Sequence, residues 1–405
     1  MPDPSEVPLD GSVAFILKLG RALQAYGTPA HRLEDTLEAV ARRLGFEAQL
    51  FGMPTGFIAS FGAGAQGRTF VQRVPPQDVD LARLDDTYAV TDALLGGRIE
   101  PDEASSKLDA IAGRRPRFGD AMEIAAFTLV SACFGVLLGG GWRDLAAASL
   151  IGASLGTLHR LTLRVRTLAR LFLVVAALVA ALLAQVIAWR NGGFSPQIAM
   201  LAGLIMLLPG LSLTIALNEL ATGNLVSGTA RFAGALVVLL QLAFGAAIGQ
   251  KLGGFLNPAA GVFHPAPDWL QWPCLLLAPV AITVLLKGRM RDLRWLWAIG
   301  FAAYGGTLLG SKLFGPETGL GLGALLAGLG SNAFSRLRRR PSLVALLPTL
   351  FLLAPGSVGL RSFAFLAQND VYSGMEAAFR TAFLAFALVT GLLIANAALP
   401  PRRSL

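Results

Sequence analysis

Long apolar stretches separated by short polar gaps fill the chain from residue 119 to residue 399, whereas residues 1–118 mix polar and apolar positions as soluble domains do. A helix that crosses a membrane needs roughly 20 predominantly apolar residues. This criterion predicts about ten transmembrane helices. They lie near residues 120–140, 145–160, 168–189, 196–217, 230–250, 270–287, 293–311, 318–335, 342–360 and 377–398.

The first 118 residues predict a small soluble α+β domain. Apolar residues between 12 and 44 recur every three or four positions, which is typical of amphipathic helices, and a turn at residues 26–29 divides this segment into two helices. The other elements expected here are strands at 47–51, 56–61 and 68–73 and helices near 78–95 and 101–112.

Charged residues make up only 15% of the chain, well below the quarter or so that is usual for soluble proteins. The net charge of +9 does not indicate nucleic acid, because the basic residues form short clusters beside the apolar stretches. Every second gap is basic, beginning with the arginines at 114–117, and cytoplasmic loops are the ones that carry such an excess. We therefore expect a multi-pass protein of a bacterial inner (cytoplasmic) membrane with both termini in the cytoplasm.

The membrane part repeats at an offset of about 147 residues. Ordered matches are Arg143-Asp144-Leu145 with Arg291-Asp292-Leu293, Pro209-Gly210 with Pro355-Gly356, and Ser227-Gly228 with Ser373-Gly374. Each repeat holds five predicted helices, and an odd number means that the second repeat enters the membrane from the opposite side. Inverted repeats are a recurring plan of secondary transporters, in which they provide alternating access.

We therefore predict an α-helical polytopic membrane protein with two inverted five-helix repeats and a small N-terminal α+β domain. Its parts are a cytoplasmic head at residues 1–118, a first repeat at 119–252, an outer linker at 253–268 and a second repeat at 269–405.

Proline and glycine interrupt the fourth and ninth predicted helices at matching places, Pro209-Gly210 and Pro355-Gly356. Proline lacks a backbone donor and frees a carbonyl of the preceding turn. In lipid such groups must be satisfied by protein, water or a substrate, and paired breaks in two repeats indicate a binding site. A simple kink is the alternative.

Polar residues in and after these breaks supply both donors and acceptors, which a zwitterionic or anionic solute needs. Hydrated loop residues beside the membrane are the alternative. The predicted substrate-binding residues are Pro209, Gly210, Ser212, Asn218, Asn224, Ser227, Arg231, Pro355, Gly356, Ser357, Arg361, Asn369 and Ser373.

Glu219 is the first candidate for a carboxylate that couples transport to protons. It follows an apolar run, and ionisable residues at membrane depth are costly and usually functional. Glu123, at the start of the first predicted helix, and Asp370, after the second break, are further candidates. Either could instead be an interfacial or hydrated residue.

We expect no metal site, cofactor or catalytic set. The three histidines, His31, His159 and His264, are far apart in the sequence and show no metal-binding spacing. Cys133 and Cys274 lie inside apolar runs. In the head we find no nucleophile with a nearby base, so a regulatory or assembly role is preferred, and self-association into a homo-oligomer stays open. Asp78, Asp80, Asp85 and Asp86 form an acidic run that we interpret as a solvated helix face.

Several of these segments resemble the threonine/serine exporter family. The segment at residues 20–34, followed by Leu44-Gly45 and Met53-Pro54-Thr55, resembles that family's cytoplasmic head. The run from Pro209-Gly210 through Asn218-Glu219-Leu220, Asn224, Gly228 and Arg231 resembles its first membrane half, and residues 269–398 resemble its second.

This resemblance implies export of threonine and serine by antiport, driven by the proton motive force. Some relatives are associated with small dicarboxylates such as succinate instead. The other functions that the sequence leaves open are a membrane-embedded enzyme with a catalytic head and a channel or scaffold.

Overall fold

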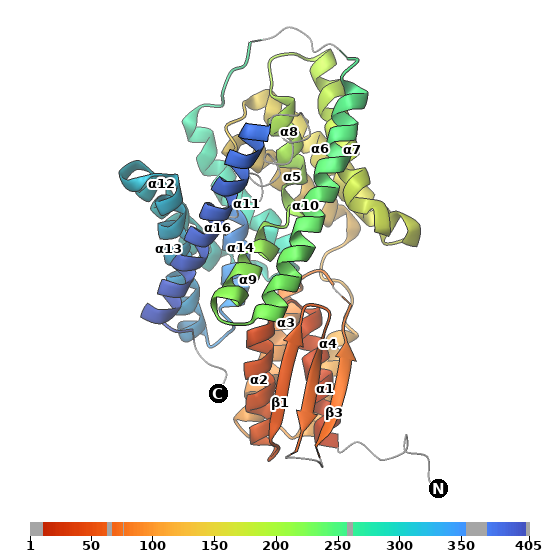
Figure 1. The fold of residues 1–405 in the computed structure, drawn as a ribbon, viewed down its shortest axis with the longest axis vertical. Helices are drawn as coiled ribbons and strands as arrows, with labels where there is room; N and C mark the ends of the chain where they lie inside the picture. Colours follow the sequence, from red (N-terminus) through yellow and green to blue (C-terminus); the bar gives the residue numbers. More distant parts are fainter. Residues whose placement is uncertain (1–10, 63–66, 76, 257–261, 354–370, 402–405) are drawn as a thin grey trace.

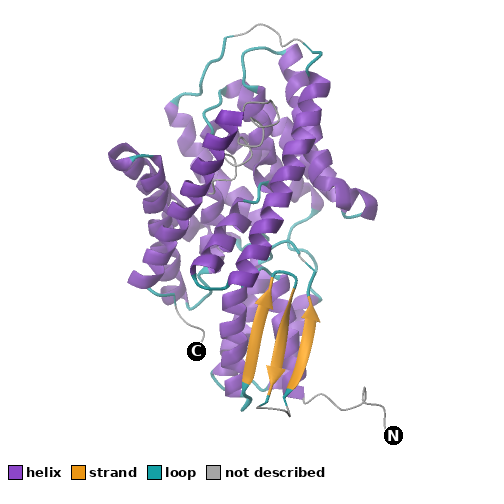
Figure 2. Cartoon of the chain, viewed as in Figure 1, coloured by secondary structure: helices purple, strands orange, loops and turns teal. Residues whose placement is uncertain are grey.

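The protein is mostly helical, with one small β-sheet near its N-terminus (Figure 2). The computed structural model describes residues 11–62, 67–75, 77–256, 262–353 and 371–401. The sheet and its helices form one end of an elongated molecule, and the longer helices form the rest (Figure 1).

The N-terminal part is a three-stranded antiparallel sheet with four helices, hereafter the head. Its elements are α1 (Gly11–Ala25), α2 (Ala30–Arg43), β1 (Ala48–Met53), β2 (Gly56–Phe61), β3 (Arg68–Arg73), α3 (Leu81–Leu95) and α4 (Pro101–Ala112). The strand order is β1-β2-β3, so β2 is central. These are the elements that the hydrophobic pattern predicts, in the predicted order.

The head core lies between the sheet and its helices. Alternate residues of β2, Phe57, Ala59 and Phe61, are buried, and so are the apolar residues of α2 that recur at three- and four-residue steps. The other face of the sheet is open to solvent and carries the exposed side chains of Phe51 and Val71. The apolar residues that recur every second position in β2 and every 3.6 positions in α2 therefore pack together in one core.

Helices occupy the predicted membrane segments in both halves. The first half contains α5 (Asp120–Leu137), α6 (Trp142–Thr162), α7 (Arg166–Arg190), α8 (Pro196–Leu204), η3 (Ile205–Leu207), α9 (Gly210–Ala221) and α10 (Leu225–Gly253). The second half contains η4 (Asp268–Leu270), α11 (Gln271–Leu285), η5 (Met290–Asp292), α12 (Leu293–Phe314), α13 (Pro316–Arg338), α14 (Leu343–Leu353) and α16 (Val371–Ala398).

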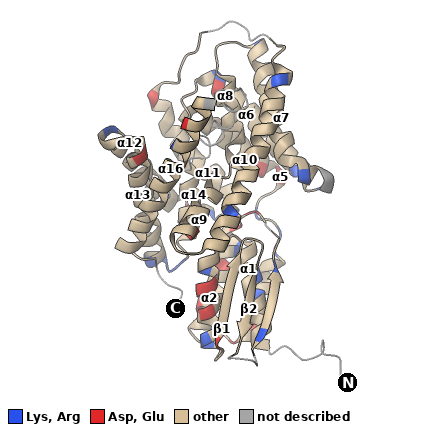
Figure 3. Cartoon of the chain, viewed as in Figure 1, with Lys and Arg blue, Asp and Glu red and all other residues tan. Residues whose placement is uncertain are grey.

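Several helices are long and apolar enough to cross a membrane. In the described part of the chain there are five of them, and the bent pair of α8 with η3 and α9 makes a sixth. Helices α6, α12 and α13 lie at further predicted positions, but their glycines and charged ends keep them out of this set. Figure 3 shows that charged residues gather in the head and near helix ends, while the helical body is largely free of them. The chain is a multi-pass membrane protein.

Small residues let the membrane helices approach closely. Helix α13 packs on α12 through Gly323, where an added Cβ would lie 2.0 Å from Oγ1 of Thr307 and 2.8 Å from the carbonyl oxygen of Ala303. Lipid tails are as apolar as the side chains, so association in a bilayer depends on such close packing rather than on the hydrophobic effect.

Replacement of Gly323 by alanine is expected to separate α12 from α13 and to destabilise the protein by about 1–3 kcal/mol, the usual cost of overpacking. The lowered midpoint of thermal unfolding in detergent micelles measures this effect. Gly305→Ala in α12 is the matched control, because an added Cβ there meets no atom within 4 Å. Equal midpoints for the two variants would contradict the packing argument.

Candidate functional site

The predicted break at Pro209-Gly210 is a sharp bend in the middle of the bundle. Helix α8 and its 3₁₀ extension η3 end at Leu207, and α9 begins at Gly210, with 55° between the two parts. Pro209 and Gly210 are buried, and Ser212 is half-buried. Pro209 cannot donate a backbone hydrogen bond, and its own carbonyl accepts one from Leu213 at 2.9 Å.

The second break lies outside the described residues. This applies to the predicted site residues Pro355, Gly356, Ser357, Arg361, Asn369 and Asp370. Helix α14, whose described part ends at Leu353, packs against α9, and so does α16. Ser373 is half-buried near the start of α16. Helices of the second half therefore lie beside the broken helix of the first.

Glu219 lies in the last turn of α9 and has no exposed surface. Its carboxylate accepts hydrogen bonds from the Ser227 hydroxyl at 2.9 Å and from Nε and Nη2 of Arg231 at 3.1 and 3.4 Å. A fourth donor is the backbone N–H of Ala30, at 3.1 Å. Ala30 is the first residue of α2 in the head, so Glu219 also faces the positive end of that helix dipole.

We call Glu219, Ser227, Arg231 and the Ala30 amide the Glu219 cluster. Its four donors bind both oxygens of the buried carboxylate, as a buried charged group requires. The apolar run before Glu219 indicates burial at membrane depth, but the sequence gives no sign that the head is its partner. Ala30 is 189 residues away along the chain, and no local pattern reports such a contact.

The other predicted polar residues of the first half are Asn218, near the end of α9, and Asn224, in the turn between α9 and α10. Asn224 precedes α10 and donates through its side-chain amide to Thr222 at 3.2 Å, while the Asn218 carbonyl accepts from the Thr222 hydroxyl at 2.9 Å. Helix α9 is 12 residues long, and its length of about 18 Å separates this turn from Pro209. The structure therefore divides the predicted site into a buried break and a polar group beside the head.

Glu123 sits in an ion-pair group at the start of α5. Its carboxylate accepts from Nη1 of Arg160 at 2.8 Å, and Arg160 also pairs with Asp120. Glu123 is buried, while Asp120 is exposed. The contact joins the beginning of α5 to the end of α6.

A second buried ionic group joins the head to the second half of the membrane part. Asp85 of α3 is 4% exposed and pairs with Nη1 of Arg289 at 2.7 Å and with Nε of Arg340 at 2.9 Å. Arg340 also binds Asp292 through two parallel hydrogen bonds of 2.5 and 2.8 Å. We call these four residues the Asp85 cluster.

The acidic run of α3 is therefore not simply a solvated face. Asp78 is exposed, and Asp80 caps α3 by accepting from the Arg83 amide at 2.9 Å, but Asp85 is buried against membrane-part arginines. Our interpretation was wrong for Asp85, because Asp85 lies on the side of α3 that contacts the membrane part. A buried carboxylate needs such partners.

Backbone contacts strengthen this junction. The amides of Leu81 and Ala82, in the first turn of α3, donate to the carbonyls of Leu286 and Lys287 at 3.0 and 3.3 Å. The free carbonyls after α11 thus satisfy the free amides that begin α3. Burial lowers the pKa of Arg340, but the hydrogen bonds from Arg340 to Asp292 and Asp85 outweigh this and raise it, so Arg340 is a permanent cation.

The histidines and cysteines form no metal site among the residues that the structure describes, where no three His, Cys, Asp or Glu side chains come together. His31 follows Ala30, and burial, with Arg32 as a second cause, lowers its pKa. Cys133 and Cys274 are free thiols.

Comparison with known protein families decides which group this arrangement belongs to. Residues 14–253 match a family model described as "Putative threonine/serine exporter", and residues 273–398 match one described as "Threonine/Serine exporter, ThrE". The chain belongs to the threonine/serine exporter family. This is a family of transporters, which agrees with the predicted class of function.

Curated proteins that resemble this chain come from fungi. A pheromone-regulated membrane protein 10 of Pichia sorbitophila is 26% identical over 90% of this chain, and one of Saccharomyces cerevisiae is 27% identical over 90%. An uncharacterized protein of Schizosaccharomyces pombe is 29% identical over 90% of the chain. The chain spans 37%, 48% and 49% of the length of these three relatives, respectively. They give no support for the expected bacterial inner membrane. No solved structure matches the chain.

Loss of Arg340 is expected to leave Asp85 and Asp292 buried without their shared cation. Removal of one partner of a buried ion pair costs about 3–5 kcal/mol. For Arg340→Gln we expect a lower thermal midpoint in detergent and faster amide hydrogen exchange throughout α3. Arg338→Gln is the control, because Arg338 lies two residues away and is exposed. If the two variants exchange α3 amides at the same rate, the Asp85 cluster does not hold the head in place.

Proposed function

We propose that this protein is a secondary transporter that exports small hydrophilic amino acids, threonine and serine, in exchange for protons moving down the proton motive force. The observation that carries the transporter mechanism is the bend at Pro209-Gly210 inside the bundle, against helices of the other half. Membership of the exporter family supports the class of substrate.

We propose that the membrane part consists of ten transmembrane helices in two inverted repeats. In this assignment α5, α6, α7, the broken α8–α9 and α10 form the first repeat, and α11, α12, α13, the helix that begins with α14, and α16 form the second. Corresponding pairs pack alike: α7 on α10, and α13 on α16. The opposite orientation is supported by the packing of α5 on α11, where Cys133 near the end of α5 neighbours Cys274 near the start of α11.

Two matching aspartates also support the repeat. Asp144 in the first turn of α6 is fully buried and accepts from the amide of Ser195, the N-cap of α8, at 2.9 Å. Asp292, its counterpart before α12, binds Arg340 just before α14. In each half, an aspartate at the start of the second helix thus contacts the start of the fourth.

We place the substrate between the broken helices of the two halves. In the described part of this region, Pro209, Gly210 and Ser212 border the bend, where the helical hydrogen-bond ladder is interrupted. Freed backbone groups at such a bend can bind a polar solute that has lost its water. The cytoplasmic head would then face the side from which the substrate is taken.

Reconstitution into liposomes tests the proposed substrate. Vesicles loaded with unlabelled threonine should accumulate labelled threonine by counterflow, and serine should compete while glycine and succinate compete weakly. No counterflow with any of the four solutes would overturn the proposal, and counterflow with succinate alone would favour a dicarboxylate exporter.

Pro209→Ala should slow threonine counterflow by about tenfold, which corresponds to a barrier increase of about 1.4 kcal/mol. The reason is that alanine restores a backbone donor and lets the helix straighten. Pro279→Ala is the matched control, since Pro279 lies inside α11 rather than at a break. Equal losses in the two variants would show that Pro209 has only a general helix-packing role.

We also propose that Glu219 couples transport to protons. In the present conformation four donors bind its carboxylate. A proton can bind when Arg231 or the Ala30 amide moves away, so proton uptake would be linked to a change between α9, α10 and the head. This linkage is what a proton-coupled transporter requires, because the proton must bind one conformation better than the other.

Glu219→Gln should retain threonine counterflow, which needs no net proton movement, and should lose uphill transport driven by a pH gradient. Glu219→Asp keeps the charge and is expected to keep part of the coupled transport. Glu103→Gln serves as the control, because Glu103 is an exposed residue of α4 that pairs with Lys107. Normal gradient-driven transport by Glu219→Gln would exclude the coupling role.

A further inference from the structure

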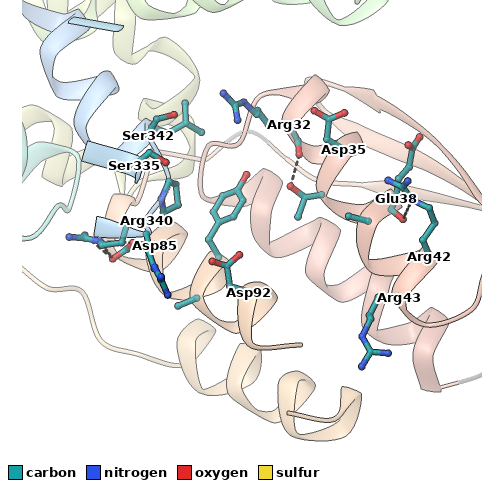
Figure 4. Close-up of a pocket in the computed structure, with 17 residues that line it drawn as sticks. Arg32, Asp35, Glu38, Arg42, Arg43, Asp85, Asp92, Ser335, Arg340 and Ser342 are labelled. Atoms are coloured by element: carbon teal, nitrogen blue, oxygen red, sulfur yellow. Dashed lines mark hydrogen bonds and ion pairs between the residues drawn. The ribbon is translucent and has the colours of Figure 1, made fainter. Parts of the chain in front are cut away.

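A cavity of about 720 Å³ lies between the head and the connection from α13 to α14. Helices α2 and α3 line it on one side, and Ser335 with residues 339–343 lines it on the other (Figure 4). Its volume is within the usual range of small-molecule sites, roughly 300–1,000 Å³. The cavity takes no part in the substrate site proposed at Pro209.

The lining is rich in charges of both signs. Five arginines and four carboxylates contribute, namely Arg32, Arg42, Arg43, Arg339 and Arg340 with Asp35, Glu38, Asp85 and Asp92. Arg340 and Asp85 bind each other in the Asp85 cluster. For Arg32, Arg43, Arg339, Asp35 and Glu38, no ion pair joins the side chain to another residue in the described ranges.

This mixture selects the charge type of a ligand. A simple anion that approached the arginines would also meet Asp35 and Glu38, and a simple cation that approached these carboxylates would meet the arginines. A zwitterion satisfies both sets, with its carboxylate on guanidinium groups and its ammonium on carboxylates. Planar guanidinium groups bind carboxylates through paired hydrogen bonds, which adds specificity.

Hydroxyl groups add a second kind of contact. Ser335 and Ser342 line the cavity on the membrane side, and Thr36 and Tyr88 line it on the head side. Burial raises the pKa of Tyr88, so its hydroxyl keeps the proton that it can donate to a ligand. A hydroxylated amino acid would find both donors and acceptors here.

The backbone conformation of Arg339 also supports a ligand site at this cavity. Arg339 ends α13 in the left-handed region, with φ at 54°, a conformation that non-glycine residues rarely adopt. Such residues gather at ligand-binding and switch regions, where the surroundings hold them in place. This conformation occurs at the residue that brings a guanidinium to the membrane side of the cavity.

We infer that this cavity is a second, regulatory site for a zwitterionic α-amino acid, and that its ligand stabilises the docked position of the head. The two walls come from segments about 300 residues apart, residues 32–43 and 335–343, and only their docking creates the site. A ligand that contacts both walls binds the docked state better and shifts the equilibrium toward it. The inference rests on the proposed function only for the choice of an amino acid as ligand.

The site also adjoins the Glu219 cluster. Helix α2 begins at Ala30, which binds Glu219, and its next turns carry Arg32, Asp35 and Thr36 to the cavity wall. An amino acid in the cavity would thus oppose movement of α2 away from Glu219. Cytosolic amino acid would control the exporter through the position of one helix.

Hydrogen exchange of the full-length protein in lipid nanodiscs locates the ligand. Threonine should slow exchange in residues 32–43 and 335–343 in a saturable manner, while 3-hydroxybutyrate, which lacks the ammonium group, and inorganic phosphate should not. Protection by phosphate or 3-hydroxybutyrate without protection by threonine would identify an anion site and overturn the proposal.

Two variants separate the charges of the site. Arg339→Gln should weaken the threonine effect by about tenfold, and Asp35→Asn should weaken it similarly while admitting 3-hydroxybutyrate. Arg338→Gln and Arg68→Gln are the controls, because both residues are exposed and outside the cavity. Controls that lose the effect as strongly as these variants would contradict the site.

Counterflow in the same preparations keeps the two proposals apart. Threonine counterflow without protection of the cavity segments overturns the regulatory site and leaves the transport proposal standing. Protection of the cavity segments without counterflow of any solute overturns the transport proposal and leaves the regulatory site standing.

Discussion

A carboxylate without exposed surface joins three separate parts of this chain. Glu219 lies in the last turn of α9, its partners Ser227 and Arg231 lie in the first two turns of α10, and Ala30 is the first residue of α2 in the head. A buried charge is stable only when it is paired and hydrogen-bonded, so these parts must meet in one arrangement. The positions of the α9–α10 turn and of the head therefore depend on each other. The contact between the head and the second half of the membrane part depends on the same head position.

That second junction is the Asp85 cluster. Arg340 and Arg289 come from two different connections of the second half, and both meet the same carboxylate of α3. Breaking a buried pair costs far more than its net contribution to stability, which makes the head position specific rather than merely favourable. With α2 held by the first half and α3 held by the second, the head contacts both halves. Any relative movement of the halves must move or release it.

The membrane part follows a different physical rule. Its helices meet through small residues, as at Gly323 against Thr307, because lipid offers no hydrophobic force between them. The exception is the bend at Pro209, where the regular ladder is interrupted inside a packed region. The ionic clusters thus lie where the head meets the membrane part, and the interrupted helix lies within the membrane part.

The hydrophobic pattern by itself determined the helices, their order and the small α+β head, because burial in lipid or in a core repeats with the period of the element. It also located the break, since proline forbids a regular helix at Pro209 whatever surrounds it. Glu219, Ser227 and Arg231 could be selected from the sequence as residues out of place at an apolar helix end, but their partner Ala30 could not. Asp85 was interpreted as a solvated residue, because on a helix pattern a carboxylate facing water and one facing arginines from another domain look the same. Only the tertiary structure brought together Ala30 with Glu219 and Asp85 with Arg340, pairs that are 189 and 255 positions apart along the chain. The reason is that a buried charge pairs with whatever partner lies next to it in space.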